Sequence, residues 1–116
     1  MRPERTPRTL EQIKDSVSFV MAALEGKTLV GYSDDRLLRQ AVERNLKIVG
    51  EAVGRLRRDD PDTASRLSEN ERIVAFRNVL VHGYDLVDDE LVWDTIETKL
   101  PVLLSDVEEL LRERPS

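Results

Sequence analysis

Hydrophobic residues recur along this chain at intervals of three and four, the spacing that places them on one face of an α-helix. The strict alternation of apolar and polar residues that marks a half-buried strand does not occur in the sequence. Glycine and proline, which break regular structure, are scarce, with five of each. The pattern therefore predicts an all-α fold, arranged as an up-and-down antiparallel four-helix bundle.

The first helix is predicted to begin near Thr9, because Thr9-Leu10-Glu11-Gln12 has the form of a capping box. Its apolar stripe continues to Leu24, and Gly26 is a natural stop. The following residues, 27–32, are expected to form a loop of ordinary length for a helical hairpin.

The second helix is predicted to start at residues 33–35 and to run to about Arg58, with apolar residues on a heptad-like seam. Two residues interrupt that seam. Asn45 could pair with a polar group across the bundle or fix the register of a helix interface. Gly50, in mid-helix, is better explained by close helix packing than by a role in a site. Residues 59–66 are expected to be a polar connector containing a turn.

The third helix is predicted to open with a second capping box, Ser68-Glu69-Asn70-Glu71, and to end at His82-Gly83. The fourth begins near Asp88-Asp89-Glu90, where acidic side chains complement the helix N-terminus. Pro101 lies inside this last helix. Because proline removes a backbone hydrogen bond, we expect a kink or a break between Lys99 and Pro101.

A length of 116 residues suits one compact domain. We expect a flexible N-terminal lead-in over residues 1–8, a single helical domain over 9–112 and a short tail over 113–116. The chain has no cysteine, which excludes disulfides and thiolate metal sites and is compatible with a reducing compartment. No apolar stretch resembles a secretory signal or a membrane span, so no membrane association and a cytoplasmic location are expected.

Charge is distributed unevenly along the chain, whose net charge is −5. Residues 33–58 carry seven basic and four acidic side chains, whereas residues 85–116 carry three basic and ten acidic ones. The net charge argues against a protein that coats nucleic acid with its whole surface. The locally basic segment could still hold a short RNA or an acidic partner, or it could be a solvated helix face of mixed charge.

The candidate chemistry is concentrated in one octapeptide, Arg77-Asn78-Val79-Leu80-Val81-His82-Gly83-Tyr84, which contains the only histidine of the chain. The guanidinium of Arg77 offers a planar fork of donors suited to phosphate, and the imidazole of His82 can accept or donate a proton near neutral pH. Asn78 is four residues before His82 and should share its helix face, where it could hold one ring nitrogen. These groups suffice to cleave a phosphodiester that carries its own nucleophile, such as RNA.

Other chemistries find little support. The sequence lacks a histidine cluster, and its acidic run at a helix start is explained by capping, so neither a metal site nor a cofactor is expected. No glycine-rich phosphate loop is present. A structural interpretation of the octapeptide remains open, because a histidine before glycine often only ends a helix and an arginine often pairs with an acid.

Three blocks of the sequence match a known family in order and spacing. They are residues 44–52 in the second predicted helix, residues 76–84 in the third, and Val92-Trp93-Asp94 with Leu100-Pro101 in the fourth. On these blocks the chain resembles the HepT-like toxins of the HEPN superfamily, small helical bundles found in prokaryotes beside a minimal nucleotidyltransferase. The similarity extends over roughly residues 9–112.

The resemblance implies a metal-independent endo- or exoribonuclease that acts as the toxin of a type VII-like toxin–antitoxin pair. It implies a homodimer whose two copies of the octapeptide line one cleft, with RNA as substrate. Arg77 and His82 would be the catalytic pair and Asn78 a supporting residue. Tyr84 would be the position to which the cognate nucleotidyltransferase antitoxin transfers AMP, adding a bulky negative group beside Arg77.

Two other functions remain open at the level of sequence. Related bundles pack against nucleotidyltransferases as non-catalytic binding or scaffold partners, although a scaffold would not require Arg77, His82 and Tyr84 together. A purely structural helical dimer without a ligand is the third possibility, and it predicts that neutral replacements of Arg77 and His82 change only stability.

Overall fold

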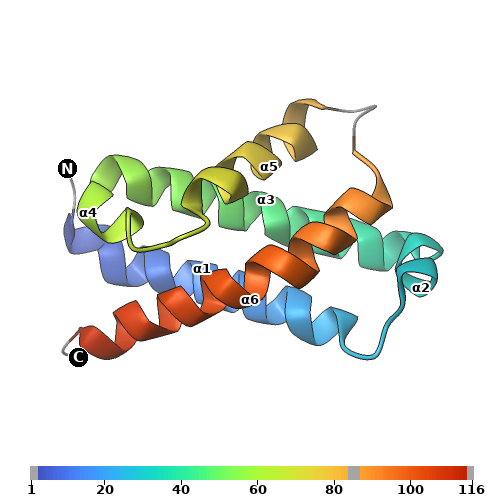
Figure 1. Cartoon of the computed structure of the whole chain (residues 1–116), viewed down its shortest axis with the longest axis horizontal. Helices are drawn as coiled ribbons and strands as arrows, with labels where there is room; N and C mark the ends of the chain where they lie inside the picture. The colour runs from blue at the N-terminus through green and yellow to red at the C-terminus, as the bar shows by residue number, and fades with distance from the viewer. Residues whose placement is uncertain (1–2, 84–86, 115–116) are drawn as a thin grey trace.

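The computed structural model describes residues 3–83 and 87–114, and all regular structure in these residues is helical (Figure 1). Four long helices form the bundle: α1 (Thr6–Leu24), α3 (Arg36–Asp59), α5 (Asn70–His82) and α6 (Asp89–Glu113). Three short elements accompany them: a 3₁₀ turn (Pro3–Arg5), α2 (Leu29–Ser33) and α4 (Pro61–Ala64). The predicted all-α bundle is confirmed, with short helices at two of its connections.

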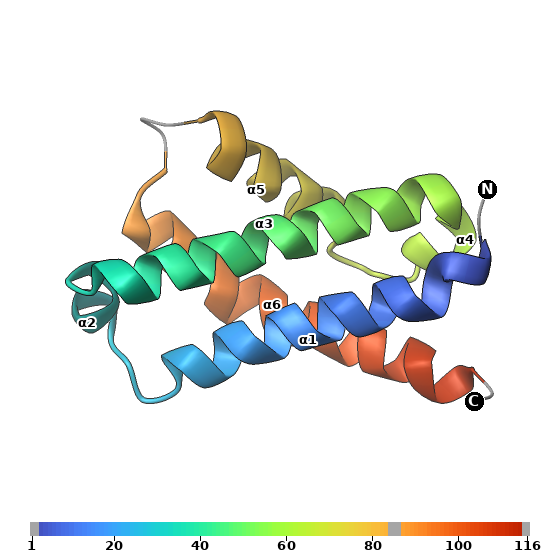
Figure 2. The same ribbon diagram turned by 180° about the vertical axis from the view of Figure 1, so that it is seen from behind.

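Helix α3 lies at the centre of the arrangement. It packs along α1 and along α5, while α6 packs against α1 (Figures 1 and 2). Both termini lie at the end of the molecule that carries α4, and α2 lies at the opposite end (Figures 1 and 2). Helix α5, which carries the octapeptide, therefore depends on α3 for its position.

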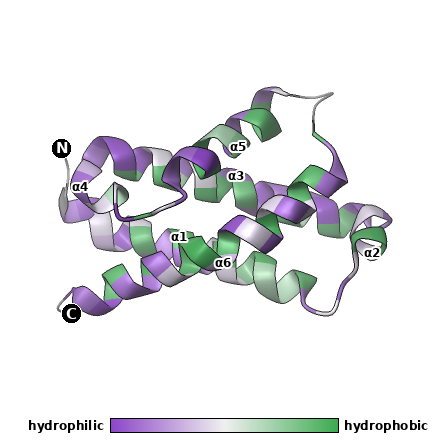
Figure 3. Cartoon of the chain, in the orientation of Figure 1, coloured by the Kyte–Doolittle hydropathy of each residue, from purple (hydrophilic) through white to green (hydrophobic). Residues whose placement is uncertain are grey.

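The core consists of the apolar stripes of the long helices, which alternate with polar residues along each ribbon (Figure 3). Fully buried positions recur at the spacing of three and four, as in Leu10, Ile13, Val17 and Val20 of α1. Burying each such side chain contributes about 1.5–3 kcal/mol. Within residues 3–83 and 87–114, none of the helices is long and apolar enough to cross a lipid bilayer.

Helix α1 begins at Thr6, so the start predicted near Thr9 is wrong. Thr6 is fully buried, and its hydroxyl donates a hydrogen bond to the carboxylate of Asp60 at 2.6 Å. Thr9 is buried inside the helix and caps nothing. Pro7 fits the first turn, where its missing N–H is not needed. Residues 6–8, expected in the lead-in, therefore belong to α1.

The loop expected over residues 27–32 is also wrong, because it contains most of α2. The hydroxyl of Thr28 accepts a hydrogen bond from the backbone N–H of Gly31 at 3.0 Å and caps the helix. Tyr32 is fully buried, with its ring centroid 5.8 Å from that of Trp93. The short helix therefore seals this end of the core.

The expected polar connector contains α4, which Asp60 caps. Its carboxylate accepts hydrogen bonds from the backbone N–H and the hydroxyl of Thr63, at 3.3 and 2.8 Å, and Arg114 lies 3.8 Å away. Burial alone would raise the pKa of Asp60, but the hydrogen bonds from Thr6 and Thr63 and the charge of Arg114 lower it below the ordinary value. Asp60 thereby joins α1, α4 and the end of α6.

The second predicted capping box is wrong as well. The N-cap of α5 is Glu69, whose side chain makes no capping hydrogen bond. Ser68 turns instead toward α6, where its backbone N–H and its hydroxyl donate to one carboxylate oxygen of Asp106 at 3.0 and 2.9 Å. Because Ser68 bonds to Asp106, which is distant in sequence, it does not cap α5.

Helix α6 starts as expected, with Asp88 accepting a hydrogen bond from the backbone N–H of Leu91 at 2.7 Å. It continues through Pro101, so a break at that residue is wrong. Pro101 is exposed, and this lets water approach the carbonyl of Glu97 that loses its partner.

Candidate functional site

Residues 77–82 of the octapeptide form the end of α5. Leu80 is buried with Ile73 and Phe76 at helical spacing, which fixes this helix by its apolar face. The backbone N–H of Gly83 donates to the carbonyl of Val79 at 2.8 Å and closes the last turn. Tyr84 lies outside the described residues.

Gly50 of α3 lies directly beneath Arg77 of α5. A Cβ atom built on Gly50 would stand 2.1 Å from the Cβ of Arg77 and 2.6 Å from its Cγ. Real Cβ atoms do not approach so closely, so a side chain at position 50 would force the two helices apart. Close helix packing at Gly50 is thus confirmed, and the residue packed against it is the candidate anion holder.

The guanidinium of Arg77 is half-buried and poorly satisfied by the protein. One of its terminal nitrogens, Nη1, donates to the Oδ1 of Asn78 at 3.3 Å. Its Nε is buried and has no hydrogen-bond partner in the described part of the chain. The ion pairs found among the described residues do not include Arg77. Apart from the buried Nε and the N–H that donates to Asn78, the donors of this guanidinium are therefore available to an anion.

A cavity of about 330 Å³ opens between α3 and α5 beside this guanidinium. Arg77, Asn78 and Val74 line it from α5. Gly50, Glu51, Gly54 and Arg58 line it from α3. The walls combine two arginines, one carboxylate and two residues without side chains, a composition suited to a charged ligand that approaches the backbone closely.

His82 lies one helical turn beyond Asn78, and both side chains are exposed. Their common outer face agrees with the four-residue spacing. The hydrogen bond expected between them is not among those of the described residues, because the Oδ1 of Asn78 accepts from Arg77 instead. Asn78 therefore orients the arginine rather than the imidazole.

Within one subunit the structure brings Arg77 and Asn78 together at the cavity and leaves His82 outside its lining, at the end of α5. Residues 3–83 and 87–114 contain no group of three or more His, Asp or Glu side chains placed to hold a metal ion. Metal independence and the catalytic roles of these residues stay predictions.

The basic residues of the second predicted helix do not form one uniform surface. Of these side chains, only Arg58 lines the cavity beside Arg77. Arg39 donates to the backbone carbonyl of Ser33, and Arg55 donates to the side chain of Gln12. Their roles within the fold account for part of the positive charge that the sequence concentrates there.

Asn45, the other polar residue of the seam, donates from Nδ2 to the carbonyl of Ala41 at 2.9 Å, one turn earlier in α3. Pairing across the bundle is not found in the part of the chain that the structure describes. The hydrogen bond stays within the helix, so it has no part in the contact between α3 and α5.

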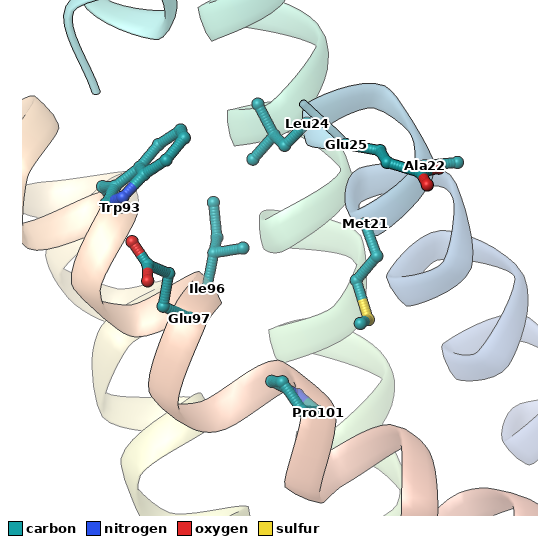
Figure 4. A pocket seen from close by; sticks show the side chains of 8 residues that line it. All are labelled: Met21, Ala22, Leu24, Glu25, Trp93, Ile96, Glu97 and Pro101. Atoms are coloured by element: carbon teal, nitrogen blue, oxygen red, sulfur yellow. The ribbon is translucent and has the colours of Figure 1, made fainter. Parts of the chain in front are cut away.

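A larger hollow of about 430 Å³ lies between α1 and α6 (Figure 4). Its walls are mainly apolar and include Met21, Leu24, Trp93 and Ile96. It shares no lining residue with the cavity beside Arg77. Its lining contains two glutamates but no arginine, lysine or histidine, so the octapeptide is the better candidate for chemistry.

Known proteins that are similar to this chain support a role in RNA cleavage. The profile of the family described as "Ribonuclease HepT-like" matches residues 9–110. A protein of Caldanaerobacter subterraneus subsp. tengcongensis named "Putative RNase TTE0752" is 32% identical over 110 residues, which cover 94% of this chain and 97% of that protein. "Putative RNase MJ0127" of Methanocaldococcus jannaschii is 27% identical over 104 residues, covering 90% of this chain and 82% of the relative. No solved structure gave a significant match.

Proposed function

The chain belongs to the HepT-like ribonuclease family of the HEPN superfamily, and on this basis we propose that it cleaves RNA without a metal ion, as the toxin of a toxin–antitoxin pair. The observation that carries the proposal is the environment of Arg77. Its guanidinium borders a polar cavity, with no carboxylate paired to it in the described residues, on the helix that ends in the only histidine.

Arg77 holds the phosphate in this proposal. A phosphodiester gains negative charge on its non-bridging oxygens as a fifth oxygen approaches phosphorus. A fixed guanidinium beside those oxygens stabilises that charge. The hydrogen bond to Asn78 and the packing against Gly50 restrict the arginine before substrate arrives, which lowers the cost of orienting it.

His82 moves the protons. The 2′-hydroxyl of the ribose attacks the adjacent phosphorus and transfers its proton to a neutral imidazole. The bond from phosphorus to the 5′-oxygen breaks, and that oxygen receives a proton from a protonated imidazole. The products are a 2′,3′-cyclic phosphate and a 5′-hydroxyl end. Imidazoles of the protein thus serve as the base and the acid, and the RNA itself supplies the nucleophile.

A homodimer supplies the two imidazoles that this scheme requires. One histidine cannot act as base and acid in a single step, whereas a twofold axis beside α5 would place His82 of both subunits at one RNA strand. The exposure of His82 at the end of α5 is compatible with such an arrangement.

Control of the toxin completes the proposal. A cognate minimal nucleotidyltransferase would transfer AMP to the hydroxyl of Tyr84, two residues after His82. The added phosphate would compete with RNA for Arg77 by charge, and the nucleoside would block access by its bulk.

The direct test is incubation of the purified chain with single-stranded RNA in excess chelator, followed by analysis of the ends of the products. Cleavage with cyclic phosphate ends is expected. The matched control is the same oligonucleotide with 2′-deoxyribose throughout, which lacks the nucleophile and should stay intact. Cleavage of the deoxy strand, or a requirement for added divalent ions, would reject the proposed chemistry. Intact RNA together with tight binding of a nucleotidyltransferase would favour the scaffold function.

A further inference from the structure

The cavity beside Arg77 contains a second arginine that the proposed chemistry does not use. Arg58 comes from the last turn of α3 and lines the same hollow as Arg77, which comes from α5. The two guanidinium groups therefore reach one space from different helices. The proposed scission of a phosphodiester uses the charge of Arg77 and leaves Arg58 without a role.

The α3 wall of the cavity has a regular construction. Gly50, Gly54 and Arg58 follow one another at intervals of four residues, so they lie on one face of the helix. The terminal nitrogen Nη1 of Arg58 lies 3.8 Å from the place that a Cβ on Gly54 would occupy. The arginine thus folds back over Gly54 toward Gly50 and Arg77, rather than extending away from the helix end.

The two glycines differ in what they touch. At Gly50 a side chain would collide with Arg77, which explains the glycine by packing. At Gly54 a Cβ would meet only the flexible tip of Arg58, so the described fold does not need a glycine there. Glycine weakens a helix interior, and the open backbone at Gly54 is instead suited to close approach by a ligand.

The charge of the cavity favours an anion. Neither Arg58 nor Arg77 takes part in an ion pair found in residues 3–83 and 87–114. Glu51 is the one acidic residue in the lining, and it is exposed, as is Arg58. Two guanidinium groups against one solvated carboxylate leave a net positive charge next to the surface.

We propose that Arg58 binds an RNA backbone phosphate next to the scissile phosphate at Arg77, so that α3 forms a second phosphate subsite for single-stranded RNA. The subsite rests on the proposed ribonuclease function. Gly50 and Gly54 are about 6 Å apart along the helix axis. Arg77 packs over Gly50 and the tip of Arg58 lies near Gly54, one helical turn away, so the two guanidinium groups could meet neighbouring phosphates of one strand.

In this proposal Arg58 helps to hold the RNA without taking part in the chemical step. Arg77 meets the phosphate whose charge changes during the reaction, whereas Arg58 meets a phosphate whose charge stays constant. Binding at Arg58 is therefore equally strong in the ground state and the transition state, and it should affect KM rather than kcat. This division of roles separates Arg58 from the catalytic pair.

The experiment compares four versions of the 116-residue chain: the wild type, Arg58→Gln, Arg57→Gln and Gly54→Ala. Arg57 is the matched control, because it is exposed, adjacent in the same helical turn and absent from the cavity lining. Binding is measured by fluorescence anisotropy with a labelled single-stranded RNA in which every 2′-hydroxyl is methylated, so that no cleavage interferes. The measurement is repeated over a series of salt concentrations, with circular dichroism to verify that each variant is folded.

Arg58→Gln should weaken binding about fivefold near 0.1 M salt and reduce the slope of log K against log salt by about 0.7, the loss of one phosphate contact. Arg57→Gln should leave the slope within error of the wild type. With cleavable RNA, Arg58→Gln should raise KM with kcat preserved within about twofold. Gly54→Ala, which adds one methyl group and no charge, should also weaken RNA binding while the helix stays folded.

Equal losses in Arg57→Gln and Arg58→Gln would show diffuse attraction and overturn the subsite, as would an unchanged Arg58→Gln. A fall in kcat alone would also overturn it, by placing Arg58 in the chemical step. Inorganic phosphate that competes with RNA equally well in the wild type and in Arg58→Gln would contradict a phosphate contact at this residue. Arg58-dependent binding of methylated RNA without cleavage of ordinary RNA would support the subsite and reject the ribonuclease function, so the two claims can fail separately.

Discussion

Gly50 and Arg77 are so close that a Cβ on the glycine would lie 2.1 Å from the Cβ of the arginine. The catalytic candidate on α5 is therefore positioned by the absence of a side chain on α3. Gly50, in the middle of α3, thus determines how closely the side chain of Arg77 on α5 can approach α3. This contact is where the fold and the proposed chemistry meet.

Gly50→Ala tests that contact. The methyl group cannot fit without separating α3 from α5, so we expect the free energy of unfolding to fall by about 1–3 kcal/mol. The rate of cleavage should fall by more than the loss of folded protein alone would explain, because Arg77 shifts with its helix. Thermal unfolding and RNA cleavage, measured on the same samples, check both effects.

Gly54→Ala is the structural control for that variant. Its nearest neighbour would be the tip of Arg58 at 3.8 Å, so the fold accepts the methyl group. Replacing glycine in a helix interior should raise stability by up to about 1 kcal/mol. Equal destabilisation by the two alanines would contradict a special contact at position 50.

Asp60→Asn addresses the junction of α1, α4 and α6. The buried carboxylate accepts two hydroxyl hydrogen bonds, so removing its charge should cost about 1–3 kcal/mol. Because the pKa of Asp60 is lowered in the folded protein, its contribution is complete above the pKa of an unfolded aspartate, about 4, and is lost as pH falls further. The wild type should therefore lose its advantage over Asp60→Asn in acid.

Denaturant unfolding at several pH values measures this difference. Asp62→Asn is a suitable control, because Asp62 is exposed in the same short helix. An advantage of the wild type that grew as the pH fell would contradict the lowered pKa of Asp60.

Tyr32→Phe examines a buried hydroxyl. Burial and the nearby charge of Glu43 and Asp89 raise the pKa of Tyr32, so it stays neutral. Its oxygen has no hydrogen-bond partner in the described segments, and removing it should leave stability unchanged or increase it by about 1 kcal/mol. Tyr32→Ala should instead cost about 3–5 kcal/mol, because it empties the place beside Trp93. A loss above about 1 kcal/mol in Tyr32→Phe would reveal a partner for the hydroxyl.

Mixing of subunits tests the proposed homodimer, in which both copies of His82 are needed. Wild-type and His82→Ala subunits are allowed to exchange in varying proportions, and cleavage is measured for each mixture. If one imidazole is the base and the other the acid, activity should follow the square of the wild-type fraction. A linear dependence would show that each subunit acts alone.

Periodicity predicted the long helices because their apolar faces are set by local spacing. Two helix starts were wrong. Ser68, predicted to cap a helix, donates instead to Asp106, thirty-eight positions away. The first helix was predicted to begin near Thr9 but begins at Thr6, which donates to Asp60, fifty-four positions away. Such contacts depend on how the helices pack, which local patterns do not encode.

The candidate site divides in the same way. The four-residue spacing predicted that Asn78 and His82 share a helix face, and the structure has both exposed on α5. The partner of Asn78 and the cavity under Arg77 depend on α3, and the sequence offered only Gly50 as a signal of that approach. Arg58 was one of several basic residues, and only the fold separates it from Arg57.

The most direct measurement is the rate of RNA cleavage in excess chelator by the wild type and His82→Ala. His82 is exposed and ends its helix, so the variant should fold and any loss should be chemical. We expect a fall of about 100-fold or more, since general acid–base groups contribute factors of about 10²–10⁴. Full cleavage by folded His82→Ala would contradict the assignment of the proton carrier and, with it, the proposed mechanism.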